Sequence, residues 1–406
     1  MSPRDLCWGL ASLATCVACA IPPPTTAPTV ASVGKVDARP LSPAPPSSPA
    51  RREPPPLTWI IGDGGSTGFV PAVRDSESTI FYGVDDASGV TEVLDTHGRA
   101  ALSISANKLC AVKTILTARR ESVSLDLDIM SPITDDVASC LREIRPPALA
   151  FYTPSSGELS PPIEAILTHL DGCEALGVNA ASDAVAKLLG ARAGSPDGAR
   201  LETVNLVHGR MSPEGFRALA QRKGLRAVGF RGVGPVRASG ETGIAALGSL
   251  PALERVDLSY SHVKDADLRA FAHAKRIRWL SLEATDVSDE GVAQLATIAS
   301  LRELNLMFTK VGDPAIEALA ALSGLERLRL TRTDVTDRGA QALLEMSALV
   351  DLDLALTKVT DASLDGLATL PKLARVHLPD TLSQAAVERF KRMRPDVAVR
   401  WFPPSP

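Results

Sequence analysis

Aspartates recur at one fixed distance and are the first candidates for chemistry. Asp265, Asp289, Asp313, Asp337 and Asp361 are each 24 residues apart. Carboxylates gathered around one point could bind Ca²⁺ or transfer protons. This spacing instead places one acid in each repeat, which favours a structural role. Since aspartate is a preferred first residue before a helix, and Pro314 fits the first helical turn, we predict that each aspartate caps its own short helix.

The other reactive side chains form no recognisable site. The six histidines are scattered, and the sequence has no HExxH, nucleophile-elbow or phosphate-loop motif. The glycines from Gly62 to Gly65 lack the lysine of a phosphate loop and predict a turn. We therefore expect no catalytic residue, metal or cofactor. Because triads form from residues distant in sequence, a catalytic module in residues 57–120 stays open as an alternative.

A column of hydroxyl side chains has the same period. It comprises Ser261, Thr285, Thr309, Thr333, Thr357 and Thr381. Each hydroxyl follows a predicted strand, where the chain turns inward and buried backbone groups need partners. We predict that each donates to a carbonyl of the neighbouring repeat, so that the bond recurs along a stack.

The elements that position these side chains also repeat. Leucine-type residues recur every 24 residues, at Leu253, Ile277, Leu301, Leu325, Leu349 and Leu373. Within a repeat, Leu304-Asn305-Leu306 alternates as a short half-buried strand does. Ile316, Leu319 and Leu322 then have the spacing of one helix face. A constant period of this length predicts stacked coils of strand, turn and helix.

The pattern L-x-x-L-x-L-x-x-T-x-V-x-D over residues 253–378 resembles the leucine-rich repeat family. It is most similar to the bacterial variety in which threonine replaces the usual asparagine or cysteine. The resemblance implies an α/β solenoid with a parallel sheet on the concave side, short helices on the convex side, and a protein-binding role. Looser repeats from residue 123 extend the predicted solenoid to residues 123–380, with about eleven coils.

The ends of the solenoid need covers with a polar outer face. Short strands expected at Thr79–Val84, Val90–Leu94 and Ala101–Ile104 predict a β-rich N-terminal cap in residues 57–122. A helix at Ser383–Met393 and a strand at Val397–Trp401 predict a C-terminal cap in residues 381–406. We expect this cap to bury Phe390 and Trp401.

The concave face is the expected binding surface because its outward residues vary while the inward ones do not. Aromatic residues, methionine and arginine are enriched in the hot spots of protein interfaces. They gather at Tyr260, Trp279, Met307, Phe308, Arg329 and Arg332, which we name the candidate patch. Every surface carries some apolar residues, so scattered exposure is the alternative.

Composition bears on the class of partner, and the first residues predict the cellular location. The formal net charge is −4 and no basic block is present, which argues against nucleic-acid binding. Residues 1–19 predict a signal peptide whose end, Leu13 to Cys19, resembles a bacterial lipoprotein processing site. Cys19 is the favoured lipid acceptor, although Cys16 precedes it where an aliphatic residue belongs. Residues 20–56, rich in proline, predict a tether.

These features predict a non-catalytic scaffold, lipid-anchored in the bacterial cell envelope (outer membrane or periplasm), that binds a protein partner. Cys16 as lipid acceptor and plain cleavage remain open. Without the lipid, the chain would be a secreted effector or adaptor that acts on a host or neighbouring cell. The remaining cysteines, Cys110, Cys140 and Cys173, are an odd number, so one disulfide would leave one thiol free.

Overall fold

The computed structural model describes residues 60–61, 69–70, 90–94, 100–104, 106–118, 123–127, 133–153, 158–192, 200–235 and 241–402. The predictions for the signal peptide with Cys16 and Cys19, the tether, the turn at Gly62 to Gly65 and the strand at Thr79–Val84 lie outside these residues. Everything described belongs to the unit Glu53–Pro406. In the described residues, no helix combines the length and the apolar character that crossing a membrane requires.

Strands and short helices alternate along this unit. The strands are β1 (Ile60–Ile61), β2 (Phe69–Val70), β3 (Val90–Leu94), β4 (Ala100–Ile104), β5 (Val123–Leu127), β6 (Ala148–Tyr152), β7 (Ala175–Ala181), β8 (Thr203–Met211), β9 (Ala227–Gly229), β10 (Val233–Pro235), β11 (Arg255–Asp257), β12 (Trp279–Ser281), β13 (Glu303–Asn305), β14 (Arg327–Arg329), β15 (Asp351–Asp353), β16 (Arg375–His377) and β17 (Ala398–Arg400). The α-helices are α1 (Ala106–Leu109), α2 (Lys113–Ala118), α3 (Asp135–Ile144), α4 (Pro161–Thr168), α5 (Asp183–Ala191), α6 (Pro213–Leu219), α7 (Asp265–Leu268), α8 (Asp289–Ala293), α9 (Asp313–Leu319), α10 (Asp337–Leu343), α11 (Leu364–Leu367) and α12 (Gln384–Met393). Short 3₁₀ helices complete several coils, at Cys110–Val112, Ile244–Ser249, Arg269–His273, Gln294–Thr297 and Asp361–Ser363.

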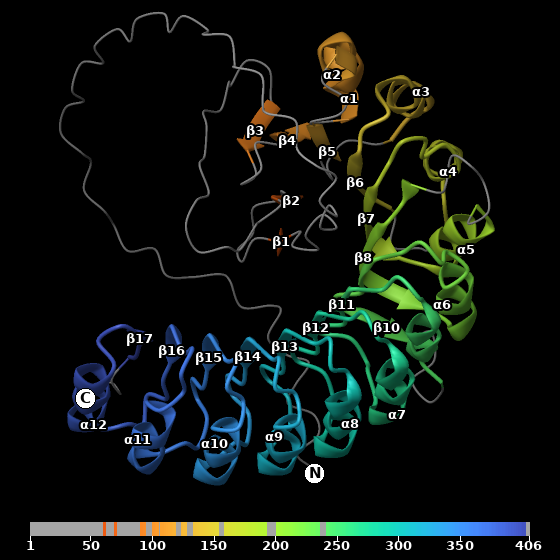
Figure 1. Cartoon of the computed structure of the whole chain (residues 1–406). Helices are drawn as coiled ribbons and strands as arrows, with labels where there is room; N and C mark the ends of the chain where they lie inside the picture. Colours follow the sequence, from red (N-terminus) through yellow and green to blue (C-terminus); the bar gives the residue numbers. More distant parts are fainter. Residues whose placement is uncertain are drawn as a thin grey trace, which may run out of the picture. The chain divides into compact units, whose positions relative to one another are not determined.

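The strands from β3 to β17 form one sheet, which is parallel from β4 onward, and β10 pairs with β8 beside the main path. Equivalent apolar residues pair coil by coil, as in Leu280↔Leu304↔Leu328↔Leu352. All four point inward and are at most 2% exposed. The strands line the inner side of the curve and the helices its outer side (Figure 1). The α/β leucine-rich repeat solenoid predicted from the period is therefore confirmed.

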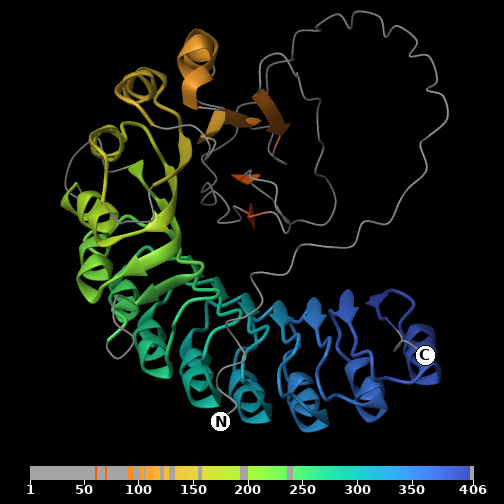
Figure 2. The ribbon, with the colours of Figure 1, turned by 180° about the vertical axis from the view of Figure 1, so that it is seen from behind.

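The irregular repeats keep the same register despite their unequal lengths. Leu125, Leu149, Leu176, Val204 and Val228 pair in that order and then join Val256 of β11. The eleven strand centres expected from the sequence are therefore all present in the parallel sheet. The view from behind shows this part of the sheet continuing into the regular coils (Figure 2).

The aspartates do not cap their own helices, and this prediction is wrong. Each is the first residue of its helix, and the cap is the residue before it, as with Gly312 before α9. The carboxylate reaches the next coil instead. The Asp313 carboxylate accepts three hydrogen bonds from that coil. The donors are the N–H of Thr336 at 2.8 Å, the hydroxyl of Thr336 at 2.6 Å and the N–H of Gly339 at 3.0 Å. The acid ladder therefore joins successive coils.

Other aspartates make the same connection. Asp265 accepts from the N–H and the hydroxyl of Ser288, and Asp361 does so from Ser383. For Asp265 and Asp313, a glycine one coil later, Gly291 or Gly339, leaves room for the carboxylate. A Cβ at Gly339 would meet Asp313 Oδ1 at 2.5 Å. These glycines were not singled out from the sequence.

Asp337 predicts a dependence of stability on pH. Burial alone would raise its pKa, but hydrogen bonds from Ser363, the Thr360 hydroxyl and the Thr360 N–H outweigh burial. They hold the pKa of Asp337 below the ordinary value of 3.8. A carboxylate whose pKa is lowered by folding stabilises the folded state at pH values above its unfolded-state pKa. This stabilisation is lost as the pH falls through the folded-state pKa. Asp337→Asn should therefore lower the melting temperature at pH 7, with a difference from wild type that shrinks below pH 3.8. A difference that stays constant with pH would contradict this.

The hydroxyl column also differs from its prediction. Thr309 donates to the carbonyl of Leu306 in its own coil at 2.6 Å, and Thr285, Thr333 and Thr357 repeat this bond. Ser261 alone among the described members donates to a neighbouring coil, at the carbonyl of Phe230. Each of these threonines gives the buried carbonyl three residues before it a hydrogen-bond donor within the same coil. Among these two columns, the aspartates rather than the hydroxyls therefore connect successive coils.

Both ends of the described solenoid contain predicted elements. β3 and β4 form an antiparallel pair where two strands were expected. At the other end, α12 and β17 occur as expected and Phe390 is fully buried. Trp401 is only half-buried, which corrects the expectation that the cap buries it.

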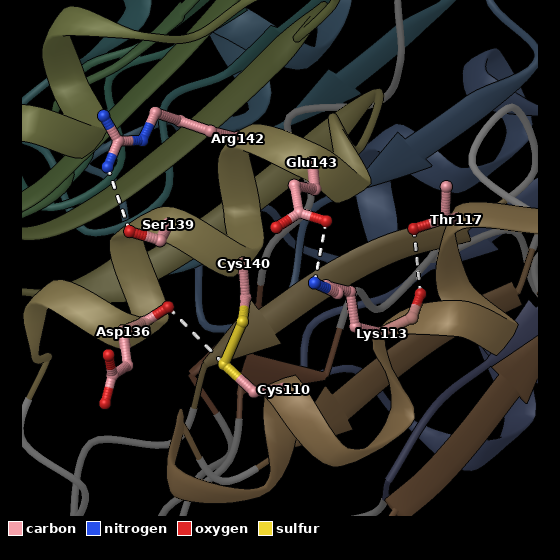
Figure 3. The surroundings of a disulfide bond; sticks show 8 residues. All are labelled: Cys110, Lys113, Thr117, Asp136, Ser139, Cys140, Arg142 and Glu143. Carbon is pink, nitrogen blue, oxygen red and sulfur yellow. Dashed lines mark hydrogen bonds and ion pairs between the residues drawn. A yellow bond between two sulfur atoms is a disulfide. The ribbon is translucent and has the colours of Figure 1, made fainter.

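A disulfide joins Cys110, in the turn before α2, to Cys140 in α3. Lys113 and Glu143 form an ion pair of 2.7 Å beside it (Figure 3). Cys173 is the free cysteine of the described residues. Burial raises the pKa of its thiol to about 12, so it is not a nucleophile at neutral pH.

Candidate protein-binding surface

The candidate patch lies on four successive coils, from β11 to β14. Trp279 is the first residue of β12 and Arg329 the last of β14. Tyr260, Met307 and Phe308 follow β11 and β13, and Arg332 follows β14. Neighbouring strands are roughly 4.8 Å apart, so Met307, Phe308, Arg329 and Arg332 come together at the C-terminal ends of β13 and β14, and Tyr260 lies two strands away at the end of β11. Trp279 lies at the opposite, N-terminal ends and stands apart from them.

The residues after the strands share one backbone conformation. Tyr260, Ala284, Phe308, Arg332 and Leu356, which we name the exit row, have φ between 53° and 59°. This left-handed conformation is unfavourable without glycine. It is held here because the N–H of each residue from Tyr260 to Arg332 bonds a carbonyl of the following coil. Tyr260 is 47% exposed, Phe308 41% and Leu356 51%.

Polar contacts fix part of this surface. The Tyr260 hydroxyl donates to Glu283 at 2.7 Å, and the Asn305 amide donates to the same carboxylate at 3.1 Å. The guanidinium carbon of Arg231 lies 4.7 Å from the Tyr260 ring centre. The tyrosine is thus held between a cation and an acid, which reduces its conformational freedom before any partner binds.

Phe308 has a similar neighbour in Arg332, whose guanidinium carbon lies 5.8 Å from the ring centre. Arg231, Glu283 and Leu356 belong to this surface but were not among the predicted site residues. The 24-residue register places Leu356 in the column of Phe308. The signal for Arg231 is weaker because its repeat is four residues longer than the regular ones.

Charges on the sheet are mostly paired across neighbouring strands. Arg327 pairs with Glu303, Arg375 with Asp351 at 3.0 Å, and His377 lies 3.3 Å from Asp353. Arg329 and Arg332 are both exposed and have no ion-pair partner among the described residues. They are cations available to an incoming carboxylate.

The concave face is not uniformly accessible. Outward positions on β6, β8 and β9 are buried, with Ala150 at 1%, Asn205 at 5% and Ala227 at 0% exposed. From β13 onward the equivalent positions open, as at half-exposed Asn305 and exposed Arg329. The accessible part of this face on the described sheet is therefore its C-terminal half.

The described residues offer little for catalysis. They contain no group of three histidine, cysteine or acidic side chains that could hold a metal ion. Asp257, whose pKa burial raises, accepts from the N–H and hydroxyl of Ser259. Ser259 and its neighbour Ser281 are each 2% exposed, so neither hydroxyl is presented to a substrate.

A hollow of about 620 Å³ lies at the C-terminal coil, beside Asp361, Ser383 and Trp401. Asp361 already accepts two hydrogen bonds from Ser383 there. The hollow shares no residue with the candidate patch and is lined by coil-joining groups.

Comparisons with known proteins found one family model and several similar solved structures. The family model described as leucine-rich repeat matches residues 298–320 and 324–344. An internalin from Listeria monocytogenes is similar in structure at 14% identity, covering 74% of this chain and 89% of that protein, with a TM-score of 0.45. Internalin C2 of the same organism shares 16% identity over 68% of this chain and 92% of its own, with a TM-score of 0.37. The search of curated proteins found no match.

Proposed function

Because its coils are leucine-rich repeats, we propose that this chain is a non-catalytic scaffold that binds a protein partner through its concave strand face. The observation that carries the proposal is a set of residues at the C-terminal ends of β11, β13 and β14, in which Tyr260, Phe308, Arg329 and Arg332 are exposed and Met307 is half-buried. Large rigid aromatic rings and arginines contribute most to protein interfaces. Trp279 adds an aromatic ring on the other side of the same face.

We further propose that the scaffold is exported to the bacterial cell envelope. The Cys110–Cys140 disulfide supports export, because such bonds persist in oxidising compartments and are rare in the cytosol (Figure 3). The proposed anchor is a lipid on Cys19, with residues 20–56 as the tether. The domain boundaries set out from the sequence belong to the same proposal.

The function is tested by capturing a partner from envelope extracts with the immobilised chain. Phe308→Ala combined with Arg329→Ala should reduce capture at least about tenfold, since removing two central interface side chains costs more than about 1.4 kcal/mol. Arg269→Ala, on the helical side, is the matched control and should leave capture unchanged. Melting temperatures of all variants show whether the fold persists. Equal capture by the double variant and wild type would discard this surface.

The second candidate, a secreted effector or adaptor, differs only in the missing lipid. It is kept because each cysteine departs once from the processing motif: Cys19 has Cys16 in the aliphatic position, and Cys16 has Thr15 in the small-residue position directly before it. Growth with a fatty-acid analogue should label wild type but not Cys19→Ala, whereas Cys16→Ala should remain labelled. Wild-type chain found unlabelled in the medium would favour the secreted protein.

A further inference from the structure

The exit row has an order of side chains that suits one kind of partner. Along the stack it presents a phenol ring, a methyl group, a phenyl ring, a guanidinium and an isobutyl group, from Tyr260 to Leu356. Since strands are roughly 4.8 Å apart, the rings of Tyr260 and Phe308 are attached about 10 Å apart. Ala284, which is half-exposed, lies between them. Because its side chain is only a methyl group, the space between the two rings is not filled by a larger side chain of this row.

The cations beside this apolar stretch form no ion pair with the described residues, and the nearest strand carboxylate, Asp353 beside Arg329, lies 3.3 Å from His377 instead. Arg327 and Arg375, on the same sheet, each have a carboxylate on the preceding strand. Arg329 and Arg332 have none among the described residues, although both are exposed. Arginine binds carboxylates through two parallel hydrogen bonds, and complementary charge selects partners more than it adds affinity.

We propose that the exit row and Arg329 bind an acidic segment of the partner in which a carboxylate is two residues from an aromatic or aliphatic side chain. The apolar side chain packs over Ala284, between Tyr260 and Phe308, and the carboxylate meets Arg332 and Arg329. Arg332 leans toward Phe308, its guanidinium carbon 5.8 Å from the ring centre. Ala284 and Arg332 are two strands apart, about 10 Å at the backbone, and side chains two residues apart in an extended segment are about 7 Å apart on one face. The long Arg332 side chain, which leans toward Phe308, can span the remaining distance. The inference rests on the proposed function.

The test selects random linear peptides, displayed on phage, against the full-length chain. The selected peptides should be enriched in Asp or Glu two residues from Leu, Phe, Tyr or Trp. Binding of the selected peptides should then weaken at least about tenfold in Ala284→Leu, because the larger side chain fills the space between Tyr260 and Phe308 in which the peptide's apolar side chain would pack. Leucine is tolerated by this backbone position, as Leu356 has φ of 55°. Arg332→Glu should weaken binding as strongly and shift a repeated selection toward Lys and Arg.

Arg269→Glu makes the same charge change on the helical side and should leave peptide binding within about twofold. Selected peptides without an excess of acidic residues overturn the inference, as does binding that is insensitive to either Ala284→Leu or Arg332→Glu. The capture experiment above is read separately. Capture lost in Phe308→Ala/Arg329→Ala without an acidic preference among peptides overturns this inference alone, whereas unchanged capture overturns the proposed function.

Discussion

Asp313→Ala should lower the free energy of unfolding by about 3 kcal/mol, because hydrogen bonds to a charged group contribute about 1.5–3 kcal/mol each and part of that is recovered by water. Three donors of the next coil, two on Thr336 and one on Gly339, would lose their acceptor. Two of them are backbone N–H groups at the start of α10, which need partners. Chemical denaturation followed by circular dichroism measures the loss.

Asp286→Ala is the matched control for this prediction. Its carboxylate has an ion pair with Lys310 at 3.6 Å in which both side chains are more than 70% exposed. Such surface pairs contribute about 0–1 kcal/mol. Gly339→Ala gives an independent check, since its Cβ would displace the Asp313 carboxylate and should also destabilise. If Asp313→Ala costs no more than Asp286→Ala, the acid ladder does not hold the coils together.

Loss of the disulfide should lower stability by a similar amount near the N-terminal end of the described solenoid. Cys110→Ser should lower the free energy of unfolding of the first coils by about 3.5 kcal/mol, because a cross-link over 30 residues restricts the unfolded chain. Coils of a solenoid can open separately. Hydrogen exchange of β4 and β5 therefore reports the change more directly than a global melting curve.

A reductant separates the cross-link from other effects of the substitution. Cys110 is half-buried, so serine leaves little empty space. Added reductant should bring wild-type exchange rates close to those of Cys110→Ser and leave the variant unchanged. Equal exchange in reduced and oxidised wild type would contradict a stabilising disulfide.

The repeat made the fold predictable because each coil obeys the same constraint. The spacing of Leu304 and Leu328 determines that both point inward, and the register pairs them. Spacing did not determine hydrogen-bond partners. Asp313 is close both to its own helix start and to the next coil, and only the structure shows that it bonds Thr336.

The candidate site was predictable in part. The period places Phe308 and Arg332 in one column, and the structure shows them in contact. Alternation along a strand could not show that Asn205 and Ala227 are buried while Arg329 is exposed. The odd number of cysteines likewise could not select the Cys110–Cys140 pair, since helix packing across coils decides it.

Photo-cross-linking reports directly which face of the solenoid contacts a partner. Full-length chains carrying a benzophenone amino acid in place of Met307, on the strand side, or of Arg269, on the helical side, are irradiated in envelope extracts. Cross-linked proteins are identified by mass spectrometry. If the partner binds the concave strand face, a protein should be cross-linked from position 307 and none from position 269. A partner cross-linked from 269 while 307 gives none would contradict binding through the concave strand face.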